Sequence, residues 1–229
     1  MSSFFEKLTP QTTPNSAPQL AHMMTNKQEA SEYETDSEVA PKGRELIDKL
    51  SKIPGGTKSS KDYEAICRDI IDYIFGRDLR DGRSQKRTSE GGDIFDLIYR
   101  VSPKHPFWIT LTRDFRARVI LFECKNYTDP IDPVQVFTTE RYLSASALRP
   151  ICFVLSRKPV NKNAIMAASG AMRESGKLLV FLSDDDLGKM LLAKDAQIEK
   201  GGSLEYMEEN DPAEILDQII YDFIAGIPR

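Results

Sequence analysis

The feature that most constrains the fold is the run Val-Ile-Leu-Phe-Glu-Cys-Lys-Asn at positions 119–126. Four apolar residues followed directly by charged ones indicate a short strand that is buried on both faces. Because side chains alternate along a strand, Glu123 and Lys125 should point to one side and Cys124 to the other, into packing. Burying two opposite charges at a strand end is costly, so the sequence predicts that this pair has a function.

Patterns on either side of this run predict an α/β fold, a mixed β-sheet flanked by helices on both faces. The expected helices are a first one between Gly43 and Pro54, followed by helices over 61–75, 134–147, 163–174, 184–192 and 212–224. The expected strands cover 94–101, 119–122, 151–155 and 178–182, with 107–111 as a further candidate. Residues 77–90 are basic, polar and glycine-containing, which predicts a loop.

Composition divides the chain into a tail and one domain. Residues 1–41 are rich in Thr, Pro, Ser, Gln and acidic side chains, which is typical of a disordered segment. Residues 42–229 are expected to form a single domain that ends in a helix. The chain of 229 residues is 40% hydrophobic and 29% charged, as in ordinary soluble proteins.

Location is expected to be cytoplasmic, without membrane association. We find neither an apolar stretch long enough to span a bilayer nor the pattern of a secretory signal. The three cysteines, Cys67, Cys124 and Cys152, are far apart and form no CxxC pair. This spacing argues against a zinc site or a disulfide framework, and a reducing compartment is the simplest setting.

Charge is distributed unevenly along the chain. The net charge of −4 argues mildly against nucleic-acid binding. However, residues 61–160 carry 17 Lys and Arg against 14 Asp and Glu, and every candidate site residue lies there. A phosphate backbone would favour that region. The only histidines are His22, in the tail, and His105 beside Pro106, so histidine-based catalysis is not expected.

A second acidic site precedes the central strand. Asp93 follows Gly91 and Gly92 and stands at the start of the strand expected over 94–101, with Asp96 as the competing acid. If the two strands pair, Asp93, Glu123 and Lys125 converge. Two carboxylates with a backbone carbonyl, that of Cys124, suit Mg²⁺, which prefers oxygen ligands. Such an ion can activate water and neutralise phosphate charge, and the lysine can orient or deprotonate the water or stabilise the developing charge.

The segment Glu123-Cys124-Lys125-Asn126 closely resembles the E-C-K-N motif of the Mrr-type type IV restriction endonucleases, a branch of the PD-(D/E)xK superfamily. The resemblance covers about residues 60–185 and departs from the pattern at Gly92, where the superfamily has its proline. It implies a restriction-endonuclease-like αβββαβ core. It also implies Mg²⁺-dependent hydrolysis of DNA, with Mn²⁺ as a substitute ion.

The resemblance assigns roles residue by residue. It implies that Asp93 and Glu123 bind the metal, that Lys125 is catalytic, that Glu64 is an additional ligand and that Gln135 lies near the metal or the phosphate. The predicted nucleic-acid contacts are Arg83, Lys86, Arg87, Asn126 and Arg141. Structural alternatives remain open: a Glu123–Lys125 salt bridge, a solvated Glu64, a packed helix start at Gln135 and a solvated loop over 77–87. The acidic run 184–186 is expected to cap a helix.

These expectations favour a DNA endonuclease that is the cleaving effector of a bacterial restriction or antiphage defence assembly. No separate DNA-reading module is visible, so a partner subunit would supply recognition or regulation. Cutting both strands would require a homodimer or sequential nicking. The alternatives are a non-catalytic nucleic-acid-binding or scaffold member of the same fold, and a structure-selective repair or resolvase nuclease.

Overall fold

The computed structural model describes residues 40–87, 94–200 and 211–228, and all of them belong to the unit formed by Ser37–Arg229. Almost all of the predicted tail, 1–41, therefore lies outside the described residues, and so does Asp93. Within the described part, no helix is long and apolar enough to span a bilayer.

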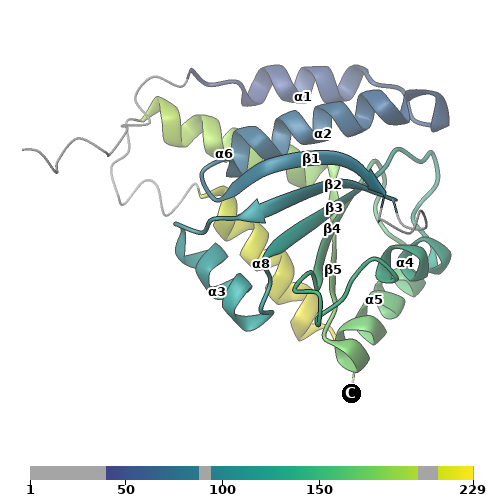
Figure 1. Cartoon of the computed structure of the whole chain (residues 1–229). Coiled ribbons are helices and arrows are strands. Elements are labelled where there is room, and N and C mark those ends of the chain that lie inside the picture. The colour runs from purple at the N-terminus through teal and green to yellow at the C-terminus, as the bar shows by residue number, and fades with distance from the viewer. Residues whose placement is uncertain (1–39, 88–93, 201–210, 229) are drawn as a thin grey trace, which may run out of the picture. The chain divides into compact units, whose positions relative to one another are not determined.

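Helices come first and last along the chain, and from β2 to α6 helices and strands alternate (Figure 1). The helical elements are α1 (Gly43–Lys52), the 3₁₀ turn η2 (Thr57–Ser59), α2 (Ser60–Phe75), α3 (Pro106–Asp114), α4 (Pro133–Glu140), α5 (Lys162–Ser175), α6 (Asp184–Glu199) and α8 (Pro212–Ala225). The strands are β1 (Leu79–Arg87), β2 (Ile94–Val101), β3 (Val119–Lys125), β4 (Ile151–Ser156) and β5 (Leu178–Ser183).

The described strands form one mixed sheet in the order β1-β2-β3-β4-β5. The pairs β1–β2 and β2–β3 are antiparallel, and β3–β4 and β4–β5 are parallel. This confirms the predicted mixed α/β sheet. The sequence α2-β1-β2-β3-α4-β4 follows the expected αβββαβ order, with α3 inserted between β2 and β3.

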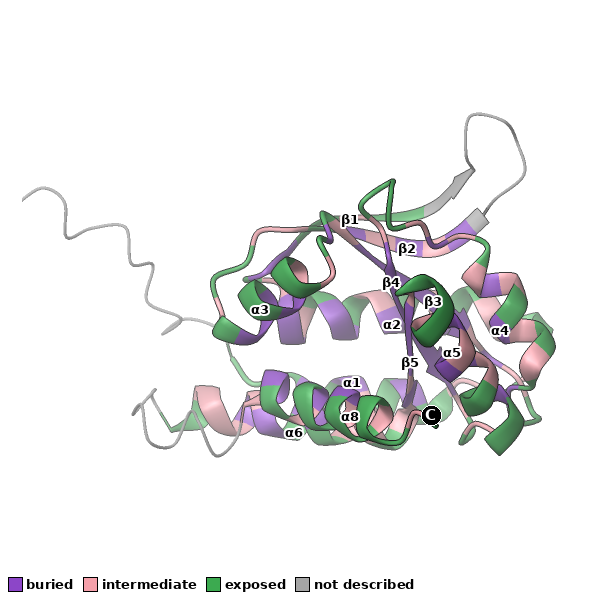
Figure 2. Cartoon of the chain, turned by 90° about the horizontal axis from the view of Figure 1, so that it is seen from below, coloured by how far each residue is buried: buried purple, intermediate pink, exposed green. Residues whose placement is uncertain are grey.

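Helices cover both faces of the sheet and bury two apolar clusters (Figures 1 and 2). One cluster lies under α1, α2, α3, α6 and α8 and receives Ile120, Phe122 and Cys124 from β3. The other lies under α4 and α5 and receives Leu121 from the same strand. The alternation expected for a strand buried on both faces is therefore confirmed, and it determines where the charges at the end of β3 lie.

Two segments differ from the sequence expectation. The predicted loop at 77–90 contains strand β1, whose exposed polar residues pair with β2 through the backbone. The candidate strand at 107–111 is helix α3 instead. His105 accepts a hydrogen bond from the Phe107 N–H at its start, and Pro106 occupies the first helical position, where proline favours helix initiation. Trp108, on this helix, packs in the core at 1% exposure.

Helix α4 is shorter than expected, since it ends at Glu140 and not at 147. Tyr142, which falls inside the range 134–147 predicted to be helical, therefore lies beyond the end of α4. The remaining helices and strands start or end close to their predicted limits, although α6 extends further, to Glu199. The acidic run after β5 caps α6 as predicted: Ser183 and Asp186 form a capping box.

Strand β1 contains a register irregularity between Arg80 and Arg83. Asp81 adopts a left-handed φ of 55°, and Gly82 lies directly against the ring of Tyr99. A Cβ at position 82 would lie 2.5 Å from a ring carbon of Tyr99, so only glycine fits without displacing the ring. The irregular step therefore lets the edge strand lie closely over a buried tyrosine.

Candidate active site

The antiparallel pairing of β2 and β3 brings two acids together at the end of the central strand. The last paired positions are Leu97 and Phe122, and the next positions along the two strands are Asp96 and Glu123. The Asp96 carboxylate accepts a hydrogen bond of 2.7 Å from the Cys124 backbone N–H. Lys125 Nζ lies 2.6 Å from Glu123 Oε1. Asp96, Glu123 and Lys125, which we call the acid–lysine site, therefore meet at one point.

The site is largely removed from solvent, because the side chains of Lys125 and Glu123 are 13% and 8% exposed. Burial, together with the charge of Glu123, raises the pKa of Asp96 to about 7, although the Cys124 N–H acts in the opposite direction. The charge of Glu64 on α2 also raises the pKa of Asp96, so Glu64 is within electrostatic reach of the site. Two close carboxylates with little solvent favour either a bound proton or a bound cation.

Lys125 remains a cation in this setting. Burial alone would lower its pKa, but the charge of Glu123 and the hydrogen bond to it outweigh burial, and the pKa is raised. The ammonium also lies 5.8 Å from the ring centre of Tyr127. Of the roles expected for the lysine, orienting water and stabilising negative charge therefore fit better than deprotonating water.

The two carboxylate oxygens of Glu123 differ in their contacts among the described residues. Glu123 Oε2 is buried and has no hydrogen-bond partner among the described residues, which is costly for an ionised carboxylate. A divalent cation would satisfy this oxygen, so Asp96 and Glu123 fit a metal of the hard, oxygen-preferring type. Within the described part of the chain, His, Cys, Asp and Glu side chains form no group of three or more that could hold a metal. A site here would therefore depend on these two acids with backbone oxygen, water or an acid from outside the described residues.

The thiol of Cys124 points away from the acids, as predicted. It is buried in the cluster under α2, and its hydrogen bond with Cys67 together with burial raises its pKa well above the usual range. The thiol therefore stays protonated and is a poor metal ligand. Only its backbone carbonyl remains as the predicted ligand.

Several predicted residues fall outside what the structure describes. Asp93 lies in the undescribed segment 88–93, so its predicted role as first acid stays a prediction. Asp96, the competing acid, is the one that the structure places beside Glu123. Lys86 and Arg87 belong to β1 and pair with Phe95 and Ile94, but their side chains lie outside the described part.

Gln135 contributes to a helix cap. Its side-chain oxygen accepts a 3.0 Å hydrogen bond from the Asp132 N–H, and the two residues form the capping box that starts α4. This contact matches the structural alternative weighed for Gln135, and its predicted catalytic role stays a prediction.

The predicted nucleic-acid contacts are in different environments. Arg83 on β1 and Arg141 at the end of α4 are exposed. Asn126, in contrast, is only 3% exposed, and its amide is bonded within the protein to Pro54 O, Gly56 O and Arg157 Nε. An amide with these contacts is not displayed to a ligand, so we do not include Asn126 in a nucleic-acid surface.

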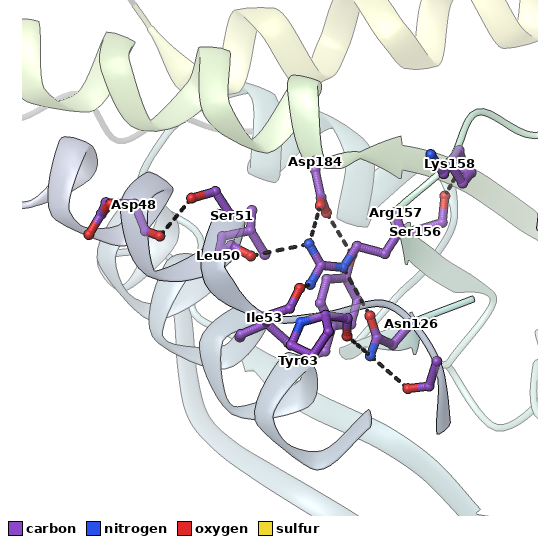
Figure 3. Close-up of polar contacts among 12 residues, drawn as sticks. Asp48, Leu50, Ser51, Ile53, Tyr63, Asn126, Ser156, Arg157, Lys158 and Asp184 are labelled. Carbon is purple, nitrogen blue, oxygen red and sulfur yellow. Dashed lines mark hydrogen bonds and ion pairs between the residues drawn. The ribbon is translucent and has the colours of Figure 1, made fainter. Parts of the chain in front are cut away.

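A polar network next to the site was not foreseen from the sequence (Figure 3). The Arg157 guanidinium, directly after β4, contacts Asn126, Asp184 and the ring of Tyr63. We call Tyr63, Asn126, Arg157 and Asp184 the arginine network. The residues come from four separate segments, and no local motif signals that an arginine after a strand will be buried.

A groove of about 670 Å³ runs between α2 and β1 and includes Glu64. Its lining residues are Lys61, Glu64, Ala65, Arg68, Asp69, Asp72 and Ser84. Two cations against three carboxylates give this surface a small negative balance. A phosphate backbone would therefore be attracted to it only when a metal ion is bound nearby.

Comparisons with known proteins give limited information about this chain. No family model matches it. Over 95 residues it is 25% identical to the putative transposon gamma-delta 80.3 kDa protein of Escherichia coli (strain K12). The matched segment is 42% of this chain but only 13% of that protein. Among solved structures, restriction endonuclease FokI superposes with a TM-score of 0.45 at 13% identity, over 77% of this chain and 31% of FokI.

Proposed function

We propose that this protein is a metal-dependent DNA endonuclease of the PD-(D/E)xK superfamily that hydrolyses phosphodiester bonds. One observation supports the proposal above all others. Two carboxylates and a lysine meet at the end of a central buried strand, and the Glu123 oxygen Oε2 is left without a partner among the described residues. The αβββαβ order of elements and the E-C-K-N segment agree with it.

In the proposed site, Glu123 and an acid of β2 hold Mg²⁺, with Mn²⁺ as a substitute. Asp96 is the acid whose position supports this, and Asp93 remains the predicted one. The Cys124 carbonyl is the further proposed ligand, and Glu64, which forms no group of three with these two acids among the described residues, stays a predicted additional ligand. The bound ion would lower the pKa of a water molecule and neutralise charge on the scissile phosphate.

The chain's own groups then divide the remaining tasks. Lys125, held as a cation 2.6 Å from Glu123, donates hydrogen bonds that orient the attacking water and stabilise the charge that develops on the phosphate. Its burial strengthens these interactions, because less solvent screens them. Gln135 is proposed to assist near the metal or the phosphate from the first turn of α4.

DNA is the proposed substrate, and Arg83, Lys86, Arg87 and Arg141 are the proposed phosphate contacts. We further propose that the chain is the cytoplasmic cleaving effector of a bacterial restriction or antiphage defence assembly. A partner subunit would choose the target, and a homodimer or sequential nicking would cut both strands.

Incubation with supercoiled plasmid tests the activity. The wild-type protein should nick or linearise the plasmid in Mg²⁺ or Mn²⁺ but not in EDTA, and Glu123→Ala should lower the rate at least about 10³-fold. Glu140→Ala is a matched control: it removes an acid from another partly buried lysine pair, 3.0 Å from Lys177, and should cleave at the wild-type rate.

The same assay separates the alternatives. Lys125→Ala should abolish cleavage while an electrophoretic shift still shows DNA binding. Wild-type protein that binds DNA but never cleaves it in either metal would overturn the nuclease proposal in favour of a binding or scaffold role. Cleavage confined to flapped or branched substrates, with linear duplex untouched, would identify a structure-selective repair enzyme.

A further inference from the structure

Asn126 fixes the chain directly after Lys125. Its side-chain amide donates to Pro54 O at 3.1 Å and to Gly56 O at 2.9 Å. Its own backbone carbonyl accepts from the Gly56 N–H at 2.7 Å. Three hydrogen bonds from one residue therefore attach the end of β3 to the linker between α1 and α2.

Arg157 attaches the same linker from the neighbouring strand (Figure 3). Its Nε donates to Asn126 Oδ1 at 2.9 Å. Its two terminal nitrogens donate to the carbonyls of Leu50, at 3.1 Å, and Ile53, at the end of α1. A planar guanidinium with several donors fits such a set of acceptors, whereas the shorter reach of a lysine ammonium would not.

The charge of Arg157 is compensated within the network. Asp184 Oδ2 lies 3.0 Å from the guanidinium, and Asp184 Oδ1 accepts a 2.9 Å hydrogen bond from the Tyr63 hydroxyl. The guanidinium also lies over the Tyr63 ring, 4.9 Å from its centre. With its side chain 12% exposed and contacts on all sides, Arg157 has little freedom to move.

The pairing of the sheet shows why this attachment matters for the acid–lysine site. The β2–β3 ladder ends at Phe122, whereas the parallel β3–β4 ladder continues to Lys125 and Ser156. Among the described residues, β3 beyond Phe122 is thus paired only with β4, apart from the bond between the Cys124 N–H and Asp96. Asn126 and Arg157 occupy the next position in the parallel register, so their side-chain bond extends the ladder past its last pair.

We propose that Asn126 and Arg157 are positioning residues that hold the strand end carrying Glu123 and Lys125 in its reactive geometry. The expected effect on DNA cleavage rests on the proposed nuclease function. Small displacements of a reacting group lower rates steeply, by about 100-fold for an error near 1 Å. Loss of the Asn126 bonds should therefore slow the chemical step more than it weakens DNA binding.

The test compares Asn126→Ala, which releases the linker that follows α1, with a control variant that acts at the start of α1. Asp195 accepts hydrogen bonds from Gly43 N and Arg44 N, at 2.7 and 3.2 Å, at the start of α1. Asp195 also accepts a 2.7 Å hydrogen bond from the Tyr73 hydroxyl on α2, so Asp195→Ala loosens the start of α1 and this contact but removes no hydrogen bond of β3. Each protein is assayed on a labelled duplex, for the single-turnover cleavage rate in Mg²⁺ and for the dissociation constant in Ca²⁺.

Asn126→Ala should cleave about 10- to 100-fold more slowly, with a dissociation constant within about threefold of wild type. Asp195→Ala should keep the wild-type cleavage rate at a temperature where both variants are folded. Equal cleavage rates for Asn126→Ala and wild type would overturn the inference, and so would an equal loss in both variants, because that pattern reflects general destabilisation. If Asn126→Ala does not fold, Asn126→Ser, which keeps an acceptor for Arg157, replaces it with the same expectations.

Amide hydrogen exchange provides a readout that does not depend on cleavage. Removal of the Asn126 side chain should speed exchange of the Cys124 N–H at least about tenfold and leave the Ile120 N–H unchanged. Unchanged exchange at Cys124 would overturn the positioning role. A wild-type protein without nuclease activity would overturn the proposed function, and the exchange result would still show whether the arginine network holds the strand end.

Discussion

Two largely buried ion pairs involve the residues at the ends of the neighbouring strands β3 and β4, and they differ in one respect. The Lys125–Glu123 pair spans 2.6 Å with side chains 13% and 8% exposed, and the Arg157–Asp184 pair spans 3.0 Å with side chains 12% and 23% exposed. Both pairs therefore bear a similar desolvation cost. Among the described residues, no buried side-chain atom of the arginine network lacks a hydrogen-bond partner, whereas Glu123 Oε2 does.

The difference shows how charge is used in this fold. Where every donor and acceptor is matched, as around Arg157, a buried charge joins segments and keeps them rigid. At Glu123, one carboxylate oxygen has no partner among the described residues, and the neighbouring acid Asp96 has its pKa raised to about 7, so the described groups leave these charges uncompensated. The acid–lysine site is therefore where we expect a ligand to add stability, and we propose that the arginine network supports it.

Removal of the Arg157 side chain should have the largest effect on stability. Arg157→Ala leaves Asp184 buried without its cation and several carbonyls without a donor, and should lower the free energy of unfolding by about 3–5 kcal/mol. Glu123→Gln keeps an oxygen that can accept from Lys125 Nζ and removes the repulsion between Glu123 and Asp96, so it should lower the free energy of unfolding by less, about 1.5 kcal/mol at most. Urea denaturation followed by Trp108 fluorescence measures both. Similar losses in the two variants would contradict the distinction between the sites.

The second acid allows a test by pH. The pKa of Asp96 is about 7 in the folded state against an ordinary value of 3.8, so between these values the folded state binds more protons than the unfolded state. Wild-type stability should therefore fall as pH rises through this window, with the full penalty present above pH 7. Asp96→Asn, which can still accept from the Cys124 N–H, should be more stable than wild type by about 1–3 kcal/mol at pH 8.

This stability gap should shrink towards pH 5, because Asp96 is then protonated in the folded wild-type protein. Thermal denaturation in EDTA at both pH values measures it, and EDTA ensures that bound metal does not mask the penalty. A gap that stays constant with pH would show that Asp96 is not held at a raised pKa.

The smallest effect is expected at the start of α4. Gln135→Ala removes one capping hydrogen bond, to the Asp132 N–H, and should lower stability by about 0.5–1 kcal/mol. If capping is its whole contribution, the plasmid cleavage rate should stay within tenfold of wild type. A loss of 100-fold or more in cleavage, with the same small change in stability, would instead establish the predicted role of Gln135 in the site.

The core of this fold was predictable because its signals are local. A fully apolar run such as 119–122 indicates a buried strand wherever it occurs, and the strict alternation then places Glu123 and Lys125 together. Strand β1 has no such signal: apart from Leu79 and Gly82 its residues are polar, the described ones at 80, 81, 83 and 84 are exposed, and it is a strand because its backbone pairs with β2. Propensity and hydrophobic pattern carry little information about an edge strand.

The details of the site depended on register, which the sequence does not display. Choosing between Asp93 and Asp96 requires knowing which residue of β2 lies opposite Glu123, and a shift of one residue reverses the face. Asn126, part of the E-C-K-N segment, was predicted to contact nucleic acid. Its actual partners, Arg157 and the linker at Pro54 and Gly56, are 31 or more residues away, so only the assembled sheet reveals them.

The polar edge strand also affects how molecules of this protein meet one another. An exposed strand edge offers unpaired backbone groups that can recruit a strand from another copy and begin aggregation. Here β1 presents exposed Arg80 and Arg83 and is distorted at Asp81 and Gly82, so a second strand would meet like charges and an irregular backbone. The step that accommodates Tyr99 thus also protects a chain rich in apolar strands from edge-to-edge association.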